Sequence, residues 1–408
     1  MQFLPSALQR SFWMTSVMAS VILMITMGIR QSMGLFVSPL NTATGLGIVS
    51  ISFALAVGQF MWGAVQPFAG ALADRYGPRP VLLGGLLMLS LGLSITPWVN
   101  TTFGLTLTLG IISAIGSGAS SFSVLISAAC QRLPAQSRGT AAGLINAGGS
   151  FGQFIFAPII QRLIQTLGWI NTCWSLALVT LLALPMVQRM DRQTSANAMA
   201  PAEPGGLTRA LQQALKDRSY LLLHLGFFTC GFHIAFLVTH LPTEVNLCGL
   251  LPQVASWSLA LIGLANIVGS LYTGFLINRL KSKNILVGMY ASRAVLILFY
   301  MAAPKTDLTF YIFSIGLGLT WLATVAPTAA IIGKLFGMRY LATLFGLTLL
   351  SHQIGGFLGA YMGGLMLEAN GNYAIMWWMD IALSSMAALA NVPIREAFVV
   401  QVQEVQKA

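Results

Sequence analysis

The stretch Gly70-Ala-Leu-Ala-Asp-Arg-Tyr-Gly-Pro-Arg79 decides the fold, because an altered copy of it, Gly274-Phe-Leu-Ile-Asn-Arg-Leu-Lys-Ser-Lys283, occurs later in the chain. The two copies lie 204 residues apart in a chain of 408 residues, so each half of the chain holds one. The pair Gly116-x-Gly118 recurs at nearly the same offset as Gly316-x-Gly318. These matches, which keep the same order, predict a fold built from two copies of one structural unit.

The composition places the chain in a membrane. Hydrophobic residues make up 56% of the sequence and charged residues only 8%, which is too little charge to cover the surface of a soluble protein of this length. The apolar runs last about 20 residues, the length of a helix that spans a bilayer, whereas the strands of a membrane barrel alternate over about ten. The run from Phe12 to about Phe36 is too long for a signal peptide and is expected to be the first membrane helix. An all-α polytopic membrane protein is therefore predicted.

Loops between the apolar runs divide the chain into twelve expected spans. They lie near 12–38, 48–72, 80–98, 103–126, 139–163, 168–188, 219–242, 252–277, 284–302, 307–331, 340–364 and 372–393. Residues 1–188 and 219–394 then form two pseudo-symmetric six-helix bundles, with a cytoplasmic linker at 189–218 and a cytoplasmic tail at 395–408. Two copies of one membrane bundle are the plan of a secondary transporter, which holds its substrate between the copies.

The net charge of +11 raises the question of nucleic acid binding, which the placement of the cations answers. Loops on one side of the predicted membrane hold all 21 lysines and arginines except Arg30, Arg162, Arg293 and Lys305. Such an excess marks the cytoplasmic side of a membrane and puts both chain termini there. The charge therefore reports topology, and no nucleic acid partner is expected.

The residues at 70–79 resemble the signature loop of the major facilitator superfamily, and the degenerate copy sits where that fold repeats the loop. The resemblance covers essentially the whole chain. It implies that the loop gates the cytoplasmic side through charge-assisted hydrogen bonds that form in one state and break in the other, although a solvated charge cluster is the alternative. The second copy has lost the acid and should contribute less. The implied gating residues are Gly70, Asp74, Arg75, Gly77, Arg79, Asn278 and Arg279.

A narrower resemblance concerns residues 28–36 (GIRQSMGLF) and 351–356 (SHQIGG), which look like bacterial relatives of the monocarboxylate transporters and the oxalate/formate antiporter. It implies that Arg30 meets substrate, as the first-helix cation of such transporters does. The bidentate guanidinium suits a carboxylate, and a cation at this depth needs water, a partner or the bundle interior, or else snorkels to the outer interface. His352 lies where the antiporter relatives place a substrate-binding lysine.

Uncharged polar residues repeat at an interval of seven, nearly two helical turns, on two further spans. Gln59 and Gln66 share one face of the second span, and Asn146 and Gln153 share one face of the fifth. Together with Asn266 on the eighth span, they are candidates for hydrogen bonds to substrate oxygens. Polar contacts between helices explain them nearly as well.

Buried charges and histidines suggest where protons bind. Arg293 and Asp380 enter the membrane from opposite sides to similar depth, which favours a structural ion pair, with Asp380 as proton carrier the alternative. His233 and His240 share a face of the seventh span and are able to titrate near neutral pH if that face lines an aqueous cavity. Two histidines satisfied by neighbouring helices are equally consistent with the sequence.

The chain also departs from the monocarboxylate pattern. Asn266 and Ser270 stand where those transporters carry an Asp and an Arg on the eighth span. The expectation is therefore a transporter of a small organic anion across a bacterial inner membrane, as a monomer, by proton symport, exchange or uniport. An exporter of amphipathic drugs or siderophores is the alternative, and a transporter-like receptor is a third. No enzyme activity, cofactor or metal site is expected, because no nucleophile–base set, phosphate loop or metal-ligand spacing occurs.

Overall fold

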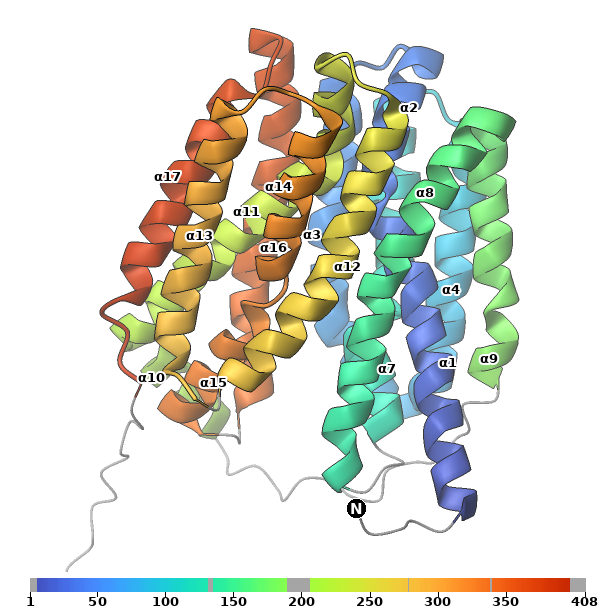
Figure 1. The fold of residues 1–408 in the computed structure, drawn as a ribbon. Helices are drawn as coiled ribbons and strands as arrows, with labels where there is room; N and C mark the ends of the chain where they lie inside the picture. The colour runs from blue at the N-terminus through green and yellow to red at the C-terminus, as the bar shows by residue number, and fades with distance from the viewer. Residues whose placement is uncertain (1–5, 131–134, 189–205, 278, 338–339, 397–408) are drawn as a thin grey trace, which may run out of the picture.

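The computed structural model describes residues 6–130, 135–188, 206–277, 279–337 and 340–396, and all regular structure in them is helical (Figure 1). This confirms the all-α prediction. Residues 189–205 of the predicted linker lie outside the described residues, and the rest of it forms the helix α10 (Gly206–Lys216). The division of the chain at 188 and 218 stays a prediction.

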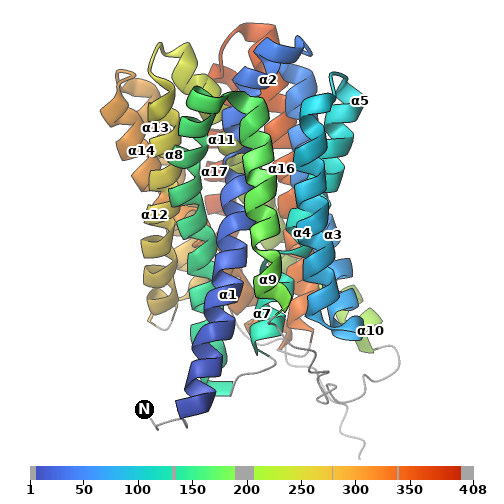
Figure 2. The same cartoon turned by 90° about the vertical axis from the view of Figure 1, so that its right-hand side faces the viewer.

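The first half of the chain supplies six long helical segments. The elements are α1 (Ser6–Gln31), η1 (Met33–Phe36), α2 (Val37–Thr44), α3 (Ile48–Tyr76), α4 (Pro78–Ile95), η2 (Thr96–Trp98), α5 (Thr102–Leu105), the π-helical η3 (Thr106–Ser113), α6 (Ala114–Ala119), α7 (Phe122–Cys130), α8 (Ala135–Leu182) and α9 (Leu184–Gln188). The α8 segment holds two predicted spans, since its backbone turns at Gly168, whose φ of 79° favours a residue without a side chain. Figure 2 shows α1 beside α8, against which it packs.

The second half repeats this pattern after α10. Its elements are α11 (Arg218–Leu247), α12 (Pro252–Leu276), α13 (Ser282–Ala302), α14 (Asp307–Thr320), α15 (Val325–Phe336), α16 (Leu341–Asn370) and α17 (Ala374–Asn391). Within the described part of the chain, nine helical stretches are long and apolar enough to cross a membrane, and one of these, 141–188, contains two spans. With α16 and α17, which run beside them, they make the twelve-helix fold (Figure 1).

Three predicted spans are not continuous. The first ends at Gln31 and resumes at Val37, so the expectation of one helix over 12–38 is wrong. The fourth breaks between α6 and α7, and the tenth breaks between α14 and α15, at corresponding places in the two halves. Helix interruptions at membrane depth are tolerated only where protein or a water-filled cavity surrounds them. Paired interruptions therefore mark the centre of the molecule as the place to look for a site.

The two halves touch along α3 and α16 and along α8 and α12. Glycines permit this approach. A Cβ atom at Gly364 would lie 2.5 Å from Ser52 Oγ, and one at Gly263 would lie 2.7 Å from the carbonyl oxygen of Ser150. Both contacts join opposite halves. They hold the molecule closed from its centre to the end where α3 begins and α16 ends.

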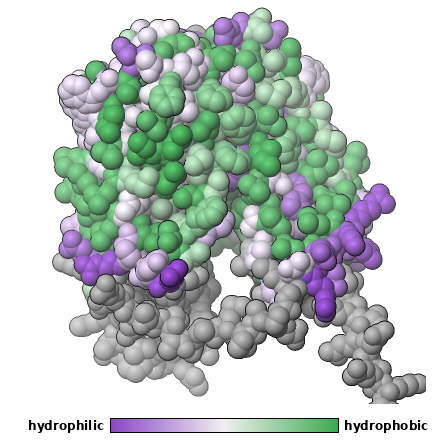
Figure 3. All heavy atoms as spheres, turned by 180° about the vertical axis from the view of Figure 1, so that it is seen from behind, coloured by the Kyte–Doolittle hydropathy of each residue, from purple (hydrophilic) through white to green (hydrophobic). Residues whose placement is uncertain are grey.

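The opposite end, here called the basic end, is open between the halves. A Cβ atom at Gly70, Gly143 or Gly346, on α3, α8 and α16, would meet nothing within 4 Å. Figure 3 shows the surface hollowed between the halves at this end. The structure is therefore a carrier-like pair of bundles open on one side. The cations that define the basic end are Arg75, Arg79, Arg279, Lys281, Lys283 and Lys334.

Candidate functional site

Arg30 lies in the last turn of α1, where the helix gives way to η1. Its guanidinium carbon stands 4.0 Å from the centroid of the Trp62 ring of α3. Its Nη2 donates to Gln59 Oε1, and its Nη1 donates to Gln31 Oε1 at 3.4 Å. No described carboxylate pairs with it. The cation therefore turns into the protein, against the snorkelling alternative, and has only neutral partners.

Gln59 connects this arginine to the other half of the molecule. Its Nε2 donates to Gln353 Oε1 of α16 at 3.5 Å. A Cβ atom at Gly356 would lie 2.7 Å from Gln59 Cγ, so α16 approaches closely because that residue is glycine. The chain Arg30–Gln59–Gln353 thus crosses the contact between halves. Gln353 was not among the predicted site residues, although its neighbour His352 was.

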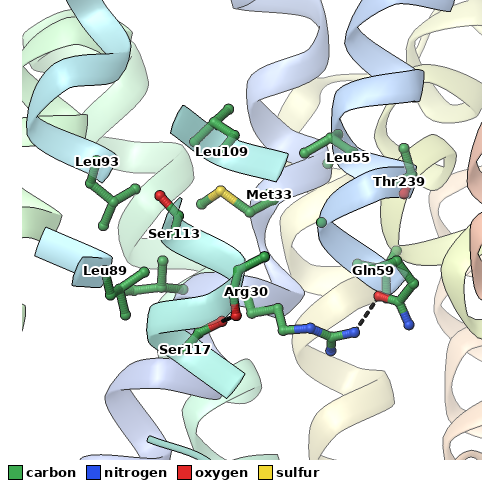
Figure 4. A pocket seen from close by; sticks show the side chains of 15 residues that line it. Arg30, Met33, Leu55, Gln59, Leu89, Leu93, Leu109, Ser113, Ser117 and Thr239 are labelled. Atoms are coloured by element: carbon green, nitrogen blue, oxygen red, sulfur yellow. Dashed lines mark hydrogen bonds between the residues drawn. The ribbon is translucent and has the colours of Figure 1, made fainter. Parts of the chain in front are cut away.

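A cavity of about 60 Å³ opens beside Arg30 (Figure 4). Figure 4 shows the arginine side chain pointing toward Gln59, with Ser113 and Ser117 of the fourth span on another side. The serines lie on η3 and α6, directly before the break in that span. Most of the lining is apolar. Besides these four residues it comprises Ile29, Met33, Gly34, Leu55, Gly58, Leu89, Leu93, Leu109, Ala114, Val238 and Thr239.

The other predicted polar residues do not line this cavity. Gln66 Nε2 donates to the Trp62 carbonyl within its own helix at 3.3 Å, and Asn146 is half-buried on α8. Gln153 is buried where α8 meets α12. Asn266 has a different role: its Nδ2 donates to Ser150 Oγ of the other half at 2.8 Å. Of the residues with the seven-residue spacing, Gln59 alone is in this cavity, and substrate binding by the others stays a prediction.

The predicted ion pair between Arg293 and Asp380 is wrong. Asp380 Oδ2 instead contacts His233 Nδ1 of α11, and Arg293 Nη2 donates to the Thr320 carbonyl at 2.8 Å. All three side chains are buried, with exposed fractions of 0% or 1%. A similar depth along the helices, from which the pair was predicted, says nothing about which side of a helix faces which neighbour.

The remaining histidines are distributed among separate contacts. His240 Nε2 donates to the Ala360 carbonyl at 2.7 Å, so its Nδ1 accepts from Tyr373 Oη at 2.9 Å. Both ring nitrogens of His240 are therefore satisfied by neighbouring helices, which is one of the two readings that the sequence left open. His224 Nδ1 contacts Ser351 Oγ at 2.7 Å, on the other face of α11.

His352 of α16 is buried, and Arg30 and Arg293 are the arginines near it. Its Nδ1 has no hydrogen-bond partner among the described residues, and its backbone carbonyl lies where a Cβ at Gly231 would be, at 1.8 Å. Both Arg30 and Arg293 are close enough to act on it electrostatically. It does not line the Arg30 cavity. Substrate binding by His352 stays a prediction.

Glu244, near the end of α11, is a buried acid that was not among the predicted site residues. Its Oε1 accepts from Tyr300 Oη at 2.8 Å and from Trp377 Nε1 at 3.2 Å. Acidic residues are only 10 of 408, so an acid at the end of an apolar span was itself a signal. The carboxylate is held inside an aromatic cluster at the closed end, where two donors satisfy one oxygen.

The first copy of the signature loop lies at the basic end, between α3 and α4. Gly77 makes the turn between α3 and α4 with a φ of 86°. Arg75 is exposed and lies over Tyr76 of its own helix, at 5.2 Å from the ring centroid, and neither it nor Arg79 forms an ion pair with a described residue. Asp74 belongs to α3 by its backbone, but its side chain lies outside the described part. The gating role of this loop stays a prediction.

Next to the second copy of the loop lies an acid, Glu396, that was not among the predicted site residues. Asn278 lies outside the described residues, and Arg279 stacks on Phe275 at 4.1 Å. Glu396, after the last helix, accepts from the backbone N–H of Ser282 at 2.9 Å and of Lys283 at 3.3 Å. These are the first N–H groups of α13, which have no partner within the helix, and the carboxylate suits that positive end. Glu396 also pairs with Lys334 at the end of α15.

Replacing Glu396 by Gln is expected to destabilise the protein by about 1–2 kcal/mol at neutral pH, because an anion at a partly buried helix N-terminus is lost. Burial raises the pKa of this carboxyl, but the hydrogen bonds from Lys334, Ser282 and Lys283 outweigh burial and hold the pKa below its usual 4.5. The stabilisation is therefore present above pH 4.5 and is lost as the pH falls through the lowered value. Thermal unfolding of wild type and variant at several pH values measures it.

The control for this experiment is Glu368→Gln, which removes an exposed carboxylate at the other end of the molecule. It should leave the melting temperature within error at every pH. Equal melting temperatures for wild type and Glu396→Gln at neutral pH would contradict the capping role of Glu396.

Comparison with known proteins shows which family has this sequence and this arrangement of helices. Residues 18–360 match the Major Facilitator Superfamily. Monocarboxylate transporter 13 of Rattus norvegicus is 25% identical over 88% of this chain and 83% of its own length, and the uncharacterized MFS-type transporter YcxA of Bacillus subtilis is 22% identical over 88% and 89%. The crystal structure of a D-xylose-proton symporter covers 94% of this chain and 98% of its own, with a TM-score of 0.75 at 14% identity. These relatives are membrane transporters rather than enzymes, and this chain belongs to the major facilitator superfamily.

Proposed function

We propose that this protein is a secondary transporter that moves a small organic anion of the monocarboxylate type, as a monomer, by rocking its two halves around Arg30. The observation that carries the proposal is the guanidinium of Arg30, which turns into the protein beside a cavity and has no carboxylate partner among the described residues. An arginine at membrane depth is costly unless a partner or water compensates it. A carboxylate substrate is the partner that its forked donors fit best.

The surroundings of Arg30 suit a small anion with an apolar body. The serines of the fourth span offer hydroxyl donors, and the leucines that line the rest of the cavity offer apolar contact. A relative over most of the chain carries the name monocarboxylate transporter, which points the same way. Small monocarboxylates have this composition: one charged end and a short apolar end.

The orientation follows from the charges. The basic end carries the cations that the positive-inside rule assigns to the cytoplasm, so we place it and both chain termini there, in a bacterial inner membrane. The conformation described here is then the one open to the cytoplasm. Closure of the basic end and opening of the opposite end complete the transport cycle.

The test is thermal stabilisation of the purified protein by formate, acetate, lactate, pyruvate and oxalate, with a set of bulky amphipathic compounds alongside. At a concentration near 100 times its dissociation constant, a ligand of the folded state adds about 2.7 kcal/mol of stability. We expect at least one of the small carboxylates to raise the melting temperature, and chloride at equal ionic strength to have no effect. Stabilisation by the bulky compounds alone would contradict the proposal and support the exporter alternative.

A further inference from the structure

We propose that His233 and Asp380, beside Arg293, form the proton-binding site of this transporter, and that the break between α14 and α15 carries the effect of that proton to the other half. The inference rests on the proposed anion transport. It assigns the coupling ion and the residues that bind it. The three side chains come from α11, α17 and α13, and none of them lines the Arg30 cavity.

The cluster has a free place for a proton. His233 Nδ1 and Asp380 Oδ2 share one hydrogen bond, so the Nδ1–H donates to the carboxylate and the Nε2 lone pair is left. His233 Nε2 and Asp380 Oδ1 are buried, and neither has a hydrogen-bond partner among the described residues. Buried polar atoms are almost always paired, so unpaired atoms on two ionisable groups in contact point to an exchangeable ligand.

The charges around His233 are few and can be named. Asp380 supplies one negative charge, and Arg293 supplies one positive charge close enough to act on His233. Cys230 and Tyr290 lie nearby, with Tyr290 Oη donating to the Gly226 carbonyl at 2.8 Å. On α16, His352 is a further titratable group close enough to Arg293 to be affected by its charge.

With a neutral His233, the carboxylate and Arg293 balance. A proton taken up at Nε2 gives the cluster a net charge of +1 and makes His233 compete with Arg293 for Asp380. Together with an anion on Arg30, this proton makes the transported load neutral, one proton for each monocarboxylate. The proton enters from and leaves to water, and no other reactant takes part.

The helix break lies directly against this cluster. The Trp321 ring centroid is 6.0 Å from that of His233. Arg293 Nη2 donates to the Thr320 carbonyl at 2.8 Å, at the C-terminal end of α14, where a cation is favoured. Any shift of Arg293 toward or away from Asp380 therefore changes how the end of α14 is held.

Asn266 links the same break to the opposite half. Its Oδ1 accepts from the Leu322 N–H at 3.0 Å, and its Nδ2 donates to Ser150 Oγ of α8 at 2.8 Å. One amide thus joins the interrupted tenth span to the interface between α8 and α12. Protonation at His233 reaches that interface through three hydrogen bonds: Arg293 to Thr320, Leu322 to Asn266, and Asn266 to Ser150.

The other histidines of α11 do not offer such a site. His240 has both nitrogens satisfied by Tyr373 and Ala360. His224 contacts Ser351, and no acid faces it among the described residues. His224 is therefore the matched control: a histidine on the same helix, two or more turns away, without a carboxylate.

The experiment measures uptake of radiolabelled lactate by proteoliposomes, with a pH gradient or by exchange against internal lactate. A gradient of one pH unit drives up to about tenfold accumulation if one proton moves with each anion. Asp380→Asn and His233→Gln should lose this accumulation and retain exchange, since exchange needs no net proton movement and shows that the protein is folded. His224→Gln should behave as wild type. Accumulation by Asp380→Asn or His233→Gln equal to wild type would overturn the proposal.

A second measurement does not depend on the substrate. An imidazolium next to an indole quenches its fluorescence, so Trp321 emission, obtained as the difference between wild type and Trp321→Phe, should fall as the pH is lowered. The fall should vanish in His233→Gln and persist in His224→Gln. A difference signal that does not change with pH would overturn the proton site. If no carboxylate binds but Trp321 titrates, the anion proposal fails and the proton site stands.

Discussion

Arg30→Gln is expected to abolish binding of small carboxylates while leaving the protein folded. Removing one partner of a desolvated charge pair costs about 2–5 kcal/mol, which corresponds to a loss of affinity of roughly 30-fold to several thousandfold. The neutral amide keeps a hydrogen-bond donor near Gln59 but loses the charge and the fork. Isothermal titration with the carboxylate that best stabilises the wild type measures the loss.

One further variant separates charge from shape at this position, and a control variant removes an arginine elsewhere. Arg30→Lys keeps the charge but loses the fork and the stacking on Trp62, so its affinity should lie between those of wild type and Arg30→Gln. Arg279→Gln removes an exposed arginine that stacks on Phe275 at the basic end, and it should bind as wild type does. Wild-type affinity in Arg30→Gln would remove Arg30 from the binding site and return it to a structural role.

The second large effect concerns the contact between halves. Gly263→Leu should force α12 away from α8, because a Cβ atom there already lies 2.7 Å from the Ser150 carbonyl and 3.0 Å from Gln153 Cβ. Overpacking of this kind costs about 1–3 kcal/mol, which shifts the balance between two conformations by roughly 5-fold to 150-fold. The molecule should then favour the state that is open at the end opposite the basic end, and transport should fall.

Labelling of a cysteine at position 52 reports this shift. Ser52 is fully buried against Gly364 in the present structure, so Ser52→Cys in a background without the four native cysteines should react slowly with a maleimide. Adding Gly263→Leu should speed the reaction. Gly288→Leu adds the same side chain where a Cβ atom would meet nothing within 4 Å, and it should not. An unchanged rate in a folded Gly263→Leu protein would mean that this contact does not hold the end closed.

Much of this architecture was readable from the sequence, because the features that encode it are local and repeated. The duplicated loop at 70–79 and 274–283, the apolar runs and the cation bias require no knowledge of how helices face one another. Arg30 was found for a similar reason, since a lone cation in an apolar span stands out whatever it contacts. Its direction toward Gln59 and the other half required the structure.

What the sequence did not predict depends on the rotation of helices and on irregular backbone. Arg293 and Asp380 were matched by depth, but the face of α17 that carries Asp380 turns to His233 instead. The break between α14 and α15 follows Gly316 and Gly318, which in the sequence served only as a landmark of the repeat. Glu396 lies beyond the last apolar run, where no periodic pattern indicates a contact, and it nevertheless caps α13.

The neutral surroundings of Arg30 have a consequence for the behaviour of this protein in an energised cell. A guanidinium whose described partners are all uncharged leaves the vacant binding site with a positive charge. Membrane voltage acts on such a charge with about 2.3 kcal/mol per 100 mV when the charge traverses the whole field. In the proposed orientation, which puts the basic end on the negative side, the resting potential should draw the vacant protein into the conformation described here. In the proposed cycle a bound monocarboxylate cancels the charge of Arg30, but the proton at His233 restores one positive charge. The voltage therefore acts alike on the loaded and the vacant carrier and does no net work over a complete cycle.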